Sequence, residues 1–247
     1  MVASLLHREL KPGSTGWCAR DLDDSEIASQ WEATRVEMVE GVIASMPSGP
    51  RVLVPGAVGF TATDLRDDNY RAIWDTNRYE MVRGVIAQMP PPFFEHGACV
   101  HELLFLVRAH LKERGQRAWS SSEVDLVLHD DLIFRADGVL LLEENAVRER
   151  RSLFSEAGRL TRLTLPPLLV IESVSLGHER HDREVKRRHY AQFGVPNYWI
   201  VDVGLRSLDC LRLRDGVYVE DATAHDVGEL SPTAFPGLTI SLKDVFL

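Results

Sequence analysis

The chain has 247 residues, of which 45% are hydrophobic, and it carries a formal net charge of −9. This length suits one large domain or a domain with an appendage, and no segment approaches the roughly 20 consecutive apolar residues of a membrane helix. The three cysteines are far apart and form no CxxC pair, which argues against a disulfide framework or a thiolate zinc site and for a reducing cytoplasm.

An internal repeat occupies the N-terminal part of the chain. Residues 31–47 match residues 74–90 at an offset of 43, with 11 of 17 positions identical. Each copy predicts two short strands around a glycine turn, where glycine tolerates the positive φ of a tight hairpin. Two copies are too few for a solenoid, which needs three or more units. We therefore expect an extension over residues 1–70, carrying a degenerate copy of the hairpin, before a domain over residues 71–247.

The middle of the chain alternates helical and strand patterns. Apolar residues at helical spacing predict a helix over 96–114, and Gly115 follows as its stop. Alternating polar and apolar residues then predict a strand hairpin over 123–137. The segment 143–162 is charged and weakly patterned, which leaves a helix and a long excursion as alternatives.

The last third of the chain predicts a return to the sheet. An apolar run predicts a buried strand over 168–172, followed by a helix from about residue 180 to 193 and a strand over 197–202. Asp215 and Gly216 mark one more hairpin. This order of elements predicts an α/β domain, with a mixed β-sheet flanked by helices.

Three carboxylates occupy positions where a carboxylate is costly. Glu172 ends an apolar strand, Asp137 ends the second strand of the hairpin over 123–137, and Glu80 lies inside the second copy of the repeat. Each needs a cation or a hydrogen-bond donor nearby if it is buried. Should the three converge, a divalent metal is required to offset their repulsion, and their hard oxygens suit Mg²⁺ or Mn²⁺. Pairing with arginines or helix capping explains such acids equally well from residue types alone.

The helix after Glu172 favours the metal-site interpretation. Asp182, Lys186 and Tyr190 recur every four residues and therefore share one helix face. A short loop can return Lys186 to the end of the strand, where it can polarise a water or stabilise a phosphorane-like transition state. An exposed helix charge is the alternative role for Lys186.

Several motifs follow one another in a fixed order from residue 78 to the C-terminus. They are Arg-Tyr-Glu-Met-Val-Arg-Gly from Arg78, Glu-His-Gly from Glu95, Arg-Ala-Asp from Arg135, Val-Ile-Glu-Ser-Val-Ser from Val170, the spaced Asp182, Lys186 and Tyr190, Gly-Val-Pro-Asn-Tyr-Trp-Ile-Val-Asp from Gly194, and Phe-Pro-Gly-Leu-Thr-Ile from Phe235. In this order they resemble the Uma-two family of restriction-endonuclease-like proteins, within the PD-(D/E)XK nuclease superfamily.

The resemblance implies a restriction-endonuclease-like core and an endonuclease that hydrolyses phosphodiester bonds, in DNA, with carboxylate-bound Mg²⁺ or Mn²⁺. Asp137 and Glu172 would bind the metal, and Glu80 would complete or orient that site. Lys186 would be the catalytic lysine of the superfamily. The usual Glu-x-Lys spacing falls on Val174, so this lysine would have moved to the following helix.

Four arginines near Lys186 offer a local DNA-binding face on an otherwise acidic chain. They are Arg180, Arg183, Arg187 and Arg188. A solvated helix face explains the same run of charge.

Three histidines and Tyr190 remain to be assigned. His96 and Tyr190 are candidate auxiliary residues, although capping or packing is the alternative for His96. His178 and His181 form an HxxH pair, which without a third ligand indicates loop and helix-surface histidines.

Two other interpretations stay open. A nuclease-fold protein that binds nucleic acid or a protein partner without cleaving it fits the acidic charge, and a transposon- or toxin-related factor fits the N-terminal extension. We expect a cytoplasmic protein that does not contact membranes. A homodimer is left open, because cutting two strands needs two sites.

Overall fold

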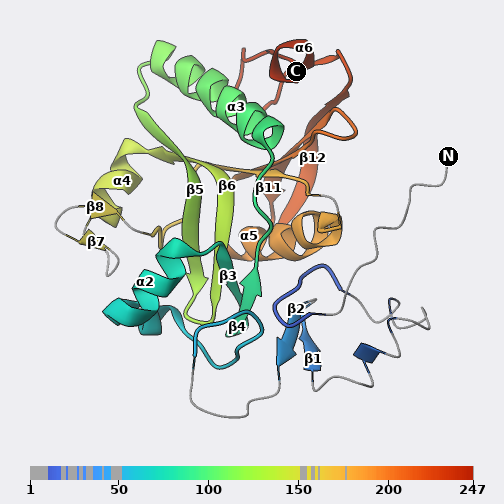
Figure 1. The fold of residues 1–247 in the computed structure, drawn as a ribbon. Coiled ribbons are helices and arrows are strands. Elements are labelled where there is room, and N and C mark those ends of the chain that lie inside the picture. The colour runs from blue at the N-terminus through green and yellow to red at the C-terminus, as the bar shows by residue number, and fades with distance from the viewer. Residues whose placement is uncertain are drawn as a thin grey trace. The chain divides into compact units, whose positions relative to one another are not determined.

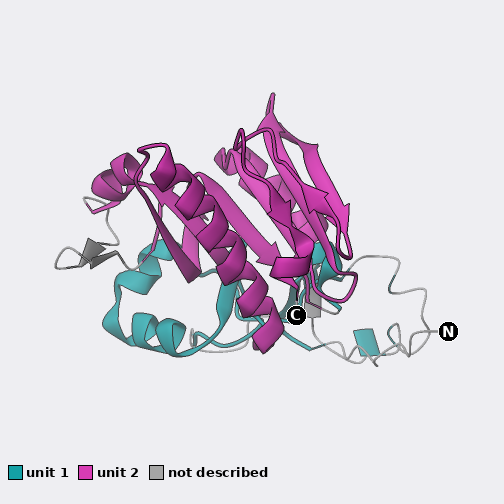
Figure 2. Ribbon diagram, turned by 90° about the horizontal axis from the view of Figure 1, so that it is seen from above, with its two compact units in different colours: residues 1–90, 129–133, 176–181 teal, residues 91–128, 134–175, 182–247 magenta. Residues whose placement is uncertain are grey.

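The computed structural model describes residues 11–17, 21, 27, 30–31, 36–40, 42–45, 52–150, 155–156, 159–160, 162–175 and 177–246. The chain divides into two compact units, which Figure 2 colours separately. Unit 1 comprises residues 1–90, 129–133 and 176–181, and unit 2 comprises residues 91–128, 134–175 and 182–247. Each unit draws on several separate segments, and the domain boundary expected near residue 70 stays a prediction.

The sheet of unit 2 is mixed, and its strands follow the order β12-β11-β10-β9-β6, with β5 paired to β6. The strands are β5 (Ala118–His129), β6 (Leu132–Leu142), β9 (Leu169–Ser173), β10 (Asn197–Asp202), β11 (Ser207–Arg214) and β12 (Val217–His225). Strands β9 and β10 run parallel, whereas β6–β9, β10–β11 and β11–β12 are antiparallel. The predicted turn joins β11 to β12, where Asp215 and Gly216 both have positive φ.

Helices accompany this sheet, as the predicted α/β class requires (Figure 1). They are α3 (Phe94–Glu113), α4 (Glu143–Glu149), the π-helix η3 (His181–Lys186), α5 (Arg187–Phe193) and α6 (Leu242–Val245). The helix predicted over 96–114 is α3. The weakly patterned segment 143–162 begins as α4 and continues with two short strands, β7 (Ser155–Glu156) and β8 (Arg159–Leu160).

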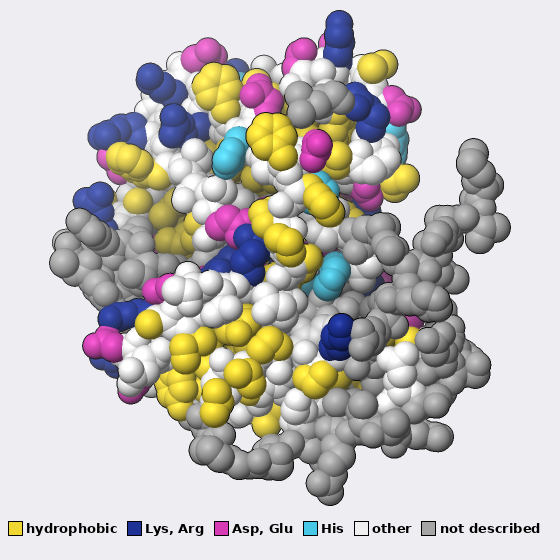
Figure 3. Space-filling model, viewed as in Figure 1, with side chains coloured by type: hydrophobic (Ala, Val, Ile, Leu, Met, Phe, Trp, Pro, Cys, Tyr) yellow, Lys and Arg dark blue, Asp and Glu magenta, His cyan; other side chains and the backbone are white. Residues whose placement is uncertain are grey.

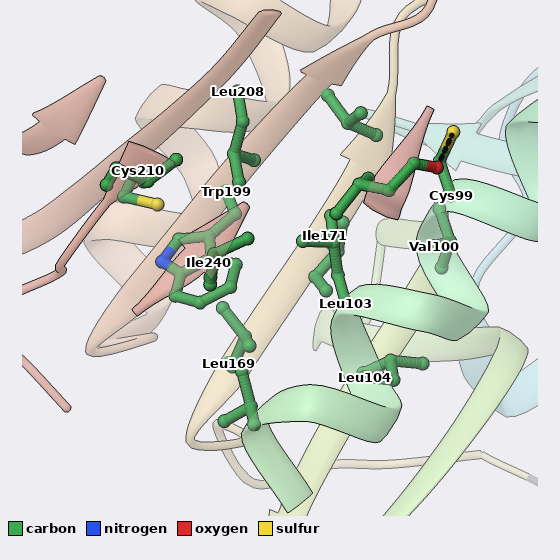
Figure 4. Packing of buried hydrophobic residues seen from close by; sticks show 14 of the residues in the cluster. Cys99, Val100, Leu103, Leu104, Leu169, Ile171, Trp199, Leu208, Cys210 and Ile240 are labelled. Carbon is green, nitrogen blue, oxygen red and sulfur yellow. Dashed lines mark hydrogen bonds between the residues drawn. The ribbon is translucent and has the colours of Figure 1, made fainter. Parts of the chain in front are cut away.

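Helix α3 packs on one face of the sheet. Leu103 of α3 and Ile171 of β9 belong to one buried hydrophobic cluster (Figure 4). The helix approaches β6 closely at Gly138, because a Cβ there would lie only 2.6 Å from Val100 Cγ1. Successive strand residues point to opposite faces, so Glu172 points away from α3. Its side chain faces Tyr190 of α5, which donates a hydrogen bond to it.

The helix predicted from about residue 180 to 193 has two parts. It begins as the π-helix His181–Lys186 and continues as α5, which ends at Gly194 with a φ of +90°. A glycine in this left-handed conformation is a common helix end. A π-helical turn is wider than an α-helical turn and recurs at functional sites.

Unit 1 contains both copies of the repeat. The hairpins are β1 (Val36–Val39) with β2 (Val42–Ser45), and β3 (Tyr79–Val82) with β4 (Val85–Gln88). Their registers are equivalent, since Met38 faces Ile43 in the first hairpin and Met81 faces Ile86 in the second. The predicted duplicated hairpin is therefore confirmed, although Gly41 of the first turn lies outside the described residues.

The second hairpin is integrated with further parts of unit 1. Strand β3 also pairs with Leu132 and Ile133, the first two residues of β6. Before the hairpin lie a 3-10 helix, η2 (Ala62–Arg66), and α2 (Asp68–Thr76). None of the described helices is long and apolar enough to cross a membrane.

Candidate active site

Glu172 is a buried carboxylate of unit 2 whose two oxygens both accept hydrogen bonds. It lies near the end of β9 with only 1% of its surface exposed. Its Oε2 accepts a hydrogen bond from Lys186 Nζ at 3.0 Å, and its Oε1 accepts one from Tyr190 Oη at 2.7 Å. An unpaired charge at this depth costs several kcal/mol, so these two donors offset the cost of burying the carboxylate.

Lys186 is buried as completely as its partner. It is 2% exposed, and its Nζ also lies 3.6 Å from Asp182 Oδ1, one helical turn earlier. The Phe134 ring centroid lies 5.9 Å from the same Nζ, which places the ammonium group within the range of a cation–π contact. The structure therefore excludes the alternative of an exposed helix charge for Lys186.

Two tyrosines support the helix that carries this lysine. Tyr190 and Tyr198 lie with their ring centroids 5.3 Å apart, and the hydroxyl of Tyr198 donates to the carbonyl oxygen of Asp182 at 2.9 Å. Burial raises the pKa of Tyr198 well above its ordinary value, and the carboxylates of Glu172 and Asp182 raise it further. The phenol therefore stays protonated and keeps its donor role.

Asp137 lies in the middle of β6, the strand next to that of Glu172, and not at a strand end as expected. In the antiparallel pairing of β6 with β9, Gly138 faces Ile171, and continuing this register by one residue sets Asp137 opposite Glu172. Side chains of directly opposite residues share one face of the sheet. Asp137 is half-buried, and its Oδ2 accepts a hydrogen bond from the backbone N–H of Ser173 at 2.8 Å.

These side chains carry an excess of negative charge. Asp137, Glu172 and Asp182 contribute three carboxylates against the one ammonium group of Lys186, which leaves a formal charge of −2. Among the described residues, no group of three or more His, Cys, Asp or Glu side chains is arranged as a ready-made metal site. Mg²⁺ is often held by only one or two carboxylates, with water and substrate phosphate filling the other positions. The donor set therefore fits a hard divalent cation bound together with a substrate.

Glu80 and His181 form a buried pair in unit 1. Both side chains are 0% exposed, and Glu80 Oε2 lies 2.8 Å from His181 Nε2. The prediction of a surface position is therefore wrong for His181. The spacing of residues in the sequence could not link this histidine to Glu80, which lies 101 residues earlier. His178 is half-buried, and its Nδ1 shares a hydrogen bond with Thr15 Oγ1 at 2.5 Å. Metal binding by Glu80 stays a prediction.

The four candidate DNA-binding arginines have distinct surroundings. Arg183 binds Asp209 and Asp202 at 2.9 and 3.1 Å, and this pairing outweighs burial to raise its pKa. Arg187 donates to the Tyr218 carbonyl oxygen, and in unit 1 Arg180 donates to that of Trp17.

Arg188 is the exposed member of the four arginines. Its guanidinium lies 3.3 Å from the His189 ring nitrogen. On the face shown in Figure 3, basic side chains are interspersed with acidic and hydrophobic ones. DNA binding by the four arginines therefore stays a prediction.

His96 lies in the first turn of α3 and is half-buried. Its ring packs edge-on against Phe93, with the centroids 5.5 Å apart. This contact agrees with the packing alternative for His96. The sequence did not single out Phe134 or Tyr198, because an aromatic residue in a strand is more often part of the core than of a site.

Comparison with known proteins places this geometry in a family. The profile of the Uma2 family, described as "Putative restriction endonuclease", matches residues 67–243. No curated protein matches the sequence. Among solved structures, a putative nuclease of the DUF820 group from Anabaena variabilis is similar, with a TM-score of 0.51 and 20% sequence identity over 68% of this chain and 89% of that chain. At this identity the likeness shows the fold alone, whereas the profile covers most of the sequence. The chain belongs to the Uma2 (Uma-two) family of restriction-endonuclease-like proteins.

Proposed function

We propose that this protein is an endonuclease that hydrolyses phosphodiester bonds in DNA with the help of Mg²⁺ or Mn²⁺. The observation that carries the proposal is the buried contact between Lys186 and Glu172. Glu172 lies on β9, which pairs with β6, the strand that carries Asp137. Membership of the Uma2 family supports a nuclease function. A carboxylate pair with one lysine is a suitable set for phosphoryl chemistry, which depends on positioning and on stabilisation of charge.

Asp137 and Glu172 are the residues that would hold the cation, and Glu80 is proposed to complete or orient the site. Such a cation supplies charge neutralisation at the scissile phosphate and activation of the attacking water. Asp137 is the half-buried member of the pair, so it is the carboxylate that a cation carrying a substrate phosphate can reach. Tyr190 fixes the rotamer of Glu172 through its hydrogen bond to Oε1.

Lys186 is proposed to act on the reacting phosphate. Its ammonium group is held by Glu172, Asp182 and the Phe134 ring, so it enters the reaction already oriented. A preorganised donor of this kind stabilises negative charge that develops on a phosphoryl oxygen or orients the attacking water. Arg188, as the exposed arginine of the group, is the first candidate for a contact with the DNA backbone.

The test is cleavage of supercoiled plasmid and of labelled single-stranded, duplex and branched DNA with Mg²⁺ or Mn²⁺. We expect cleavage by the wild type and a loss of about 100-fold or more in Glu172→Gln and Lys186→Met. Glu149→Gln is the matched control, because Glu149 is a fully buried carboxylate that accepts hydrogen bonds from Thr164 and Leu165 instead. A folded wild type that leaves all these substrates intact with both metals contradicts the proposal.

A second candidate is a protein of the same fold that binds nucleic acid or a protein partner without cleaving it. Exposures of 1% for Glu172 and 2% for Lys186 favour it, together with the net charge of −9. Binding of labelled DNA without cleavage, unaffected by Glu172→Gln, is the result that supports this candidate over the first.

A further inference from the structure

The two repeat copies are longer than their hairpins. In each copy a short segment before the hairpin pairs with the second strand of the hairpin. This segment, called the arm below, contains Pro12-Gly13 in the first copy and Pro55-Gly56 in the second. Gly13 donates to the Ile43 carbonyl oxygen at 2.6 Å, and in the second copy Gly56 donates to that of Ile86 at 2.7 Å. Both glycines have a φ of +82°, and all four residues are related by the offset of 43. Each copy is thus an arm and a hairpin with one conformation.

The small cores of the copies are equivalent as well. Trp17, Ile27 and Ile43 form the buried cluster of the first copy, with Trp31 and Met38 packed against it. The residues 43 positions later are Phe60, Tyr70, Ile86, Trp74 and Met81. In the second copy Phe60 packs edge-on against Tyr70, with centroids 5.5 Å apart. The first copy therefore retains the packing of a folded unit.

The copies bind each other reciprocally. The backbone N–H of Ser45 donates to the Gly56 carbonyl oxygen at 2.8 Å, and the N–H of Gln88 donates to the Gly13 carbonyl oxygen at 2.9 Å. Gln88 is the counterpart of Ser45, and Gly13 is the counterpart of Gly56. The same bond is therefore made twice, once in each direction, as across a two-fold axis.

Two further contacts lie where such an axis would pass. The arms cross so closely that a Cβ on Gly13 would overlap Pro55. In the same way, a Cβ on Gly56 would overlap Pro12, which is the counterpart of Pro55. Glu40 Oε1 lies 3.4 Å from Arg83 Nε, and these two residues occupy the same position of the repeat. A residue meets its own symmetry mate only next to the axis.

We propose that the surface formed by residues 54–60 and β4 is a homodimer interface, which the N-terminal copy fills within a single chain. Reciprocal contacts between equivalent positions define an isologous interface, in which one surface patch binds a second copy of itself. The surface formed by residues 54–60 and β4, called the patch below, therefore fits the same patch on a second chain. Because the first copy is tethered to the second, its effective concentration is high, and it excludes the second chain.

The proposal is tested by cross-linking with a bismaleimide, which joins two thiols without the close backbone approach that a disulfide needs, in the full chain with Cys18→Ser. Cys99 and Cys210 are buried, which keeps them out of the reaction. Arg83→Cys alone is expected to give no cross-link between chains, since residue 83 faces Glu40. With Gly13→Val added, the valine clashes with Pro55 and releases the first copy, so two chains are expected to become linked through position 83. Denaturing gels and light scattering then show twice the monomer mass.

Two control variants separate the clash from its side effects. Gly59→Val also introduces valine at a positive φ, of +76°, but its Cβ meets nothing within 4 Å, so we expect no cross-link. Adding Gly56→Val to the Gly13→Val protein damages the patch itself and is expected to abolish the cross-link. Glu40→Cys with Arg83→Cys reports docking, because the reagent joins these two positions within one chain only while the copies are paired.

Three outcomes overturn the proposal. The first is inter-chain linkage of Arg83→Cys without Gly13→Val. The second is loss of the internal cross-link in Gly13→Val without any linkage between chains, which shows an uncovered patch that does not bind itself. The third is an internal cross-link that survives Gly13→Val, which shows that the close crossing of the arms, one of the contacts from which the interface is inferred, does not hold the copies together.

Discussion

Lys186 Nζ and Glu172 Oε2 lie 3.0 Å apart, and neither side chain is more than 2% exposed. A buried pair of this kind is strongly coupled, because removing one partner leaves the other charge unpaired in a medium of low polarity. We expect Lys186→Met to lower the free energy of unfolding by about 3–5 kcal/mol. Urea denaturation measures this change.

The double variant Glu172→Gln with Lys186→Met provides the control for that prediction. It removes both charges, so a clear part of the lost stability is expected to return. A double variant as unstable as the sum of the two single variants would show that the pair is not energetically coupled. Nuclease activity is expected to be lost in all three proteins, since the chemistry needs both groups.

Tyr190→Phe separates the orientation of Glu172 from its charge. The change removes one hydrogen bond to a carboxylate, for which about 1.5–3 kcal/mol of stability is expected to be lost. Cleavage is expected to fall about 10–100-fold, as for other groups that orient metal-binding carboxylates. Tyr218→Phe is the matched control, because this buried hydroxyl donates to the Val195 carbonyl oxygen at 2.8 Å instead. Equal loss of activity in both variants would argue against an orienting role for Tyr190.

Metal binding is expected to depend on the substrate. Two carboxylates leave most positions around Mg²⁺ or Mn²⁺ to water and phosphate, so the free protein should bind the ion weakly. The melting temperature is therefore expected to rise little with Mn²⁺ alone and clearly with Mn²⁺ plus a non-hydrolysable DNA analogue. Asp137→Asn should remove the additional rise. A large shift with Mn²⁺ alone, kept in Asp137→Asn, would indicate a different metal site.

Much of this site was predictable from sequence because its geometry is local. Glu172 follows an apolar run, and strand alternation then decides which face its side chain occupies. The spacing of Lys186 and Tyr190 predicted a shared helix face, and both residues contact Glu172. Periodicity did not predict the π-helix over 181–186, since its wider turn leaves four-residue spacing almost unchanged.

Contacts between distant segments could not be predicted from the sequence. Nothing local links Glu80 to His181, and an HxxH pattern by itself indicates surface residues. The repeat showed that two hairpins exist, but the reciprocal bonds of Gly13 and Gly56 depend on how the copies pack. Local periodicity specifies the elements, whereas the pairing of elements follows from which surfaces remain to be buried.

The close packing of α3 on β6 predicts opposite effects at two glycines. A methyl group on Gly138 would lie 2.6 Å from Val100 Cγ1, so Gly138→Ala is expected to cost about 1–3 kcal/mol of stability. Gly97 lies in α3 itself, and a Cβ added there would have nothing within 4 Å. Gly97→Ala is therefore expected to stabilise by about 0.5–1 kcal/mol, through lower backbone entropy in the unfolded chain. Thermal or urea denaturation compares the two, and a neutral Gly138→Ala would show that α3 can move away from the sheet.

His110 is expected to make stability depend on pH. Burial lowers its pKa below the ordinary value of 6.5, and the neighbouring guanidinium of Arg114 lowers it further. Between 6.5 and the lower pKa of the folded state, the unfolded chain binds a proton that the folded chain does not. Stability is therefore expected to fall as the pH falls through this window.

Replacing the histidine tests that sign. His110→Gln cannot titrate, so its free energy of unfolding should change less than that of the wild type between pH 7 and pH 5, measured by urea denaturation at each pH. His225→Gln, at an exposed position on β12, is the control, and its free energy of unfolding should change with pH as that of the wild type does. His110 Nδ1 lies 3.1 Å from Arg114 Nη1, a contact that requires the neutral ring as acceptor. An unchanged slope in His110→Gln would mean that the ring is released from Arg114 and protonated without loss of the fold.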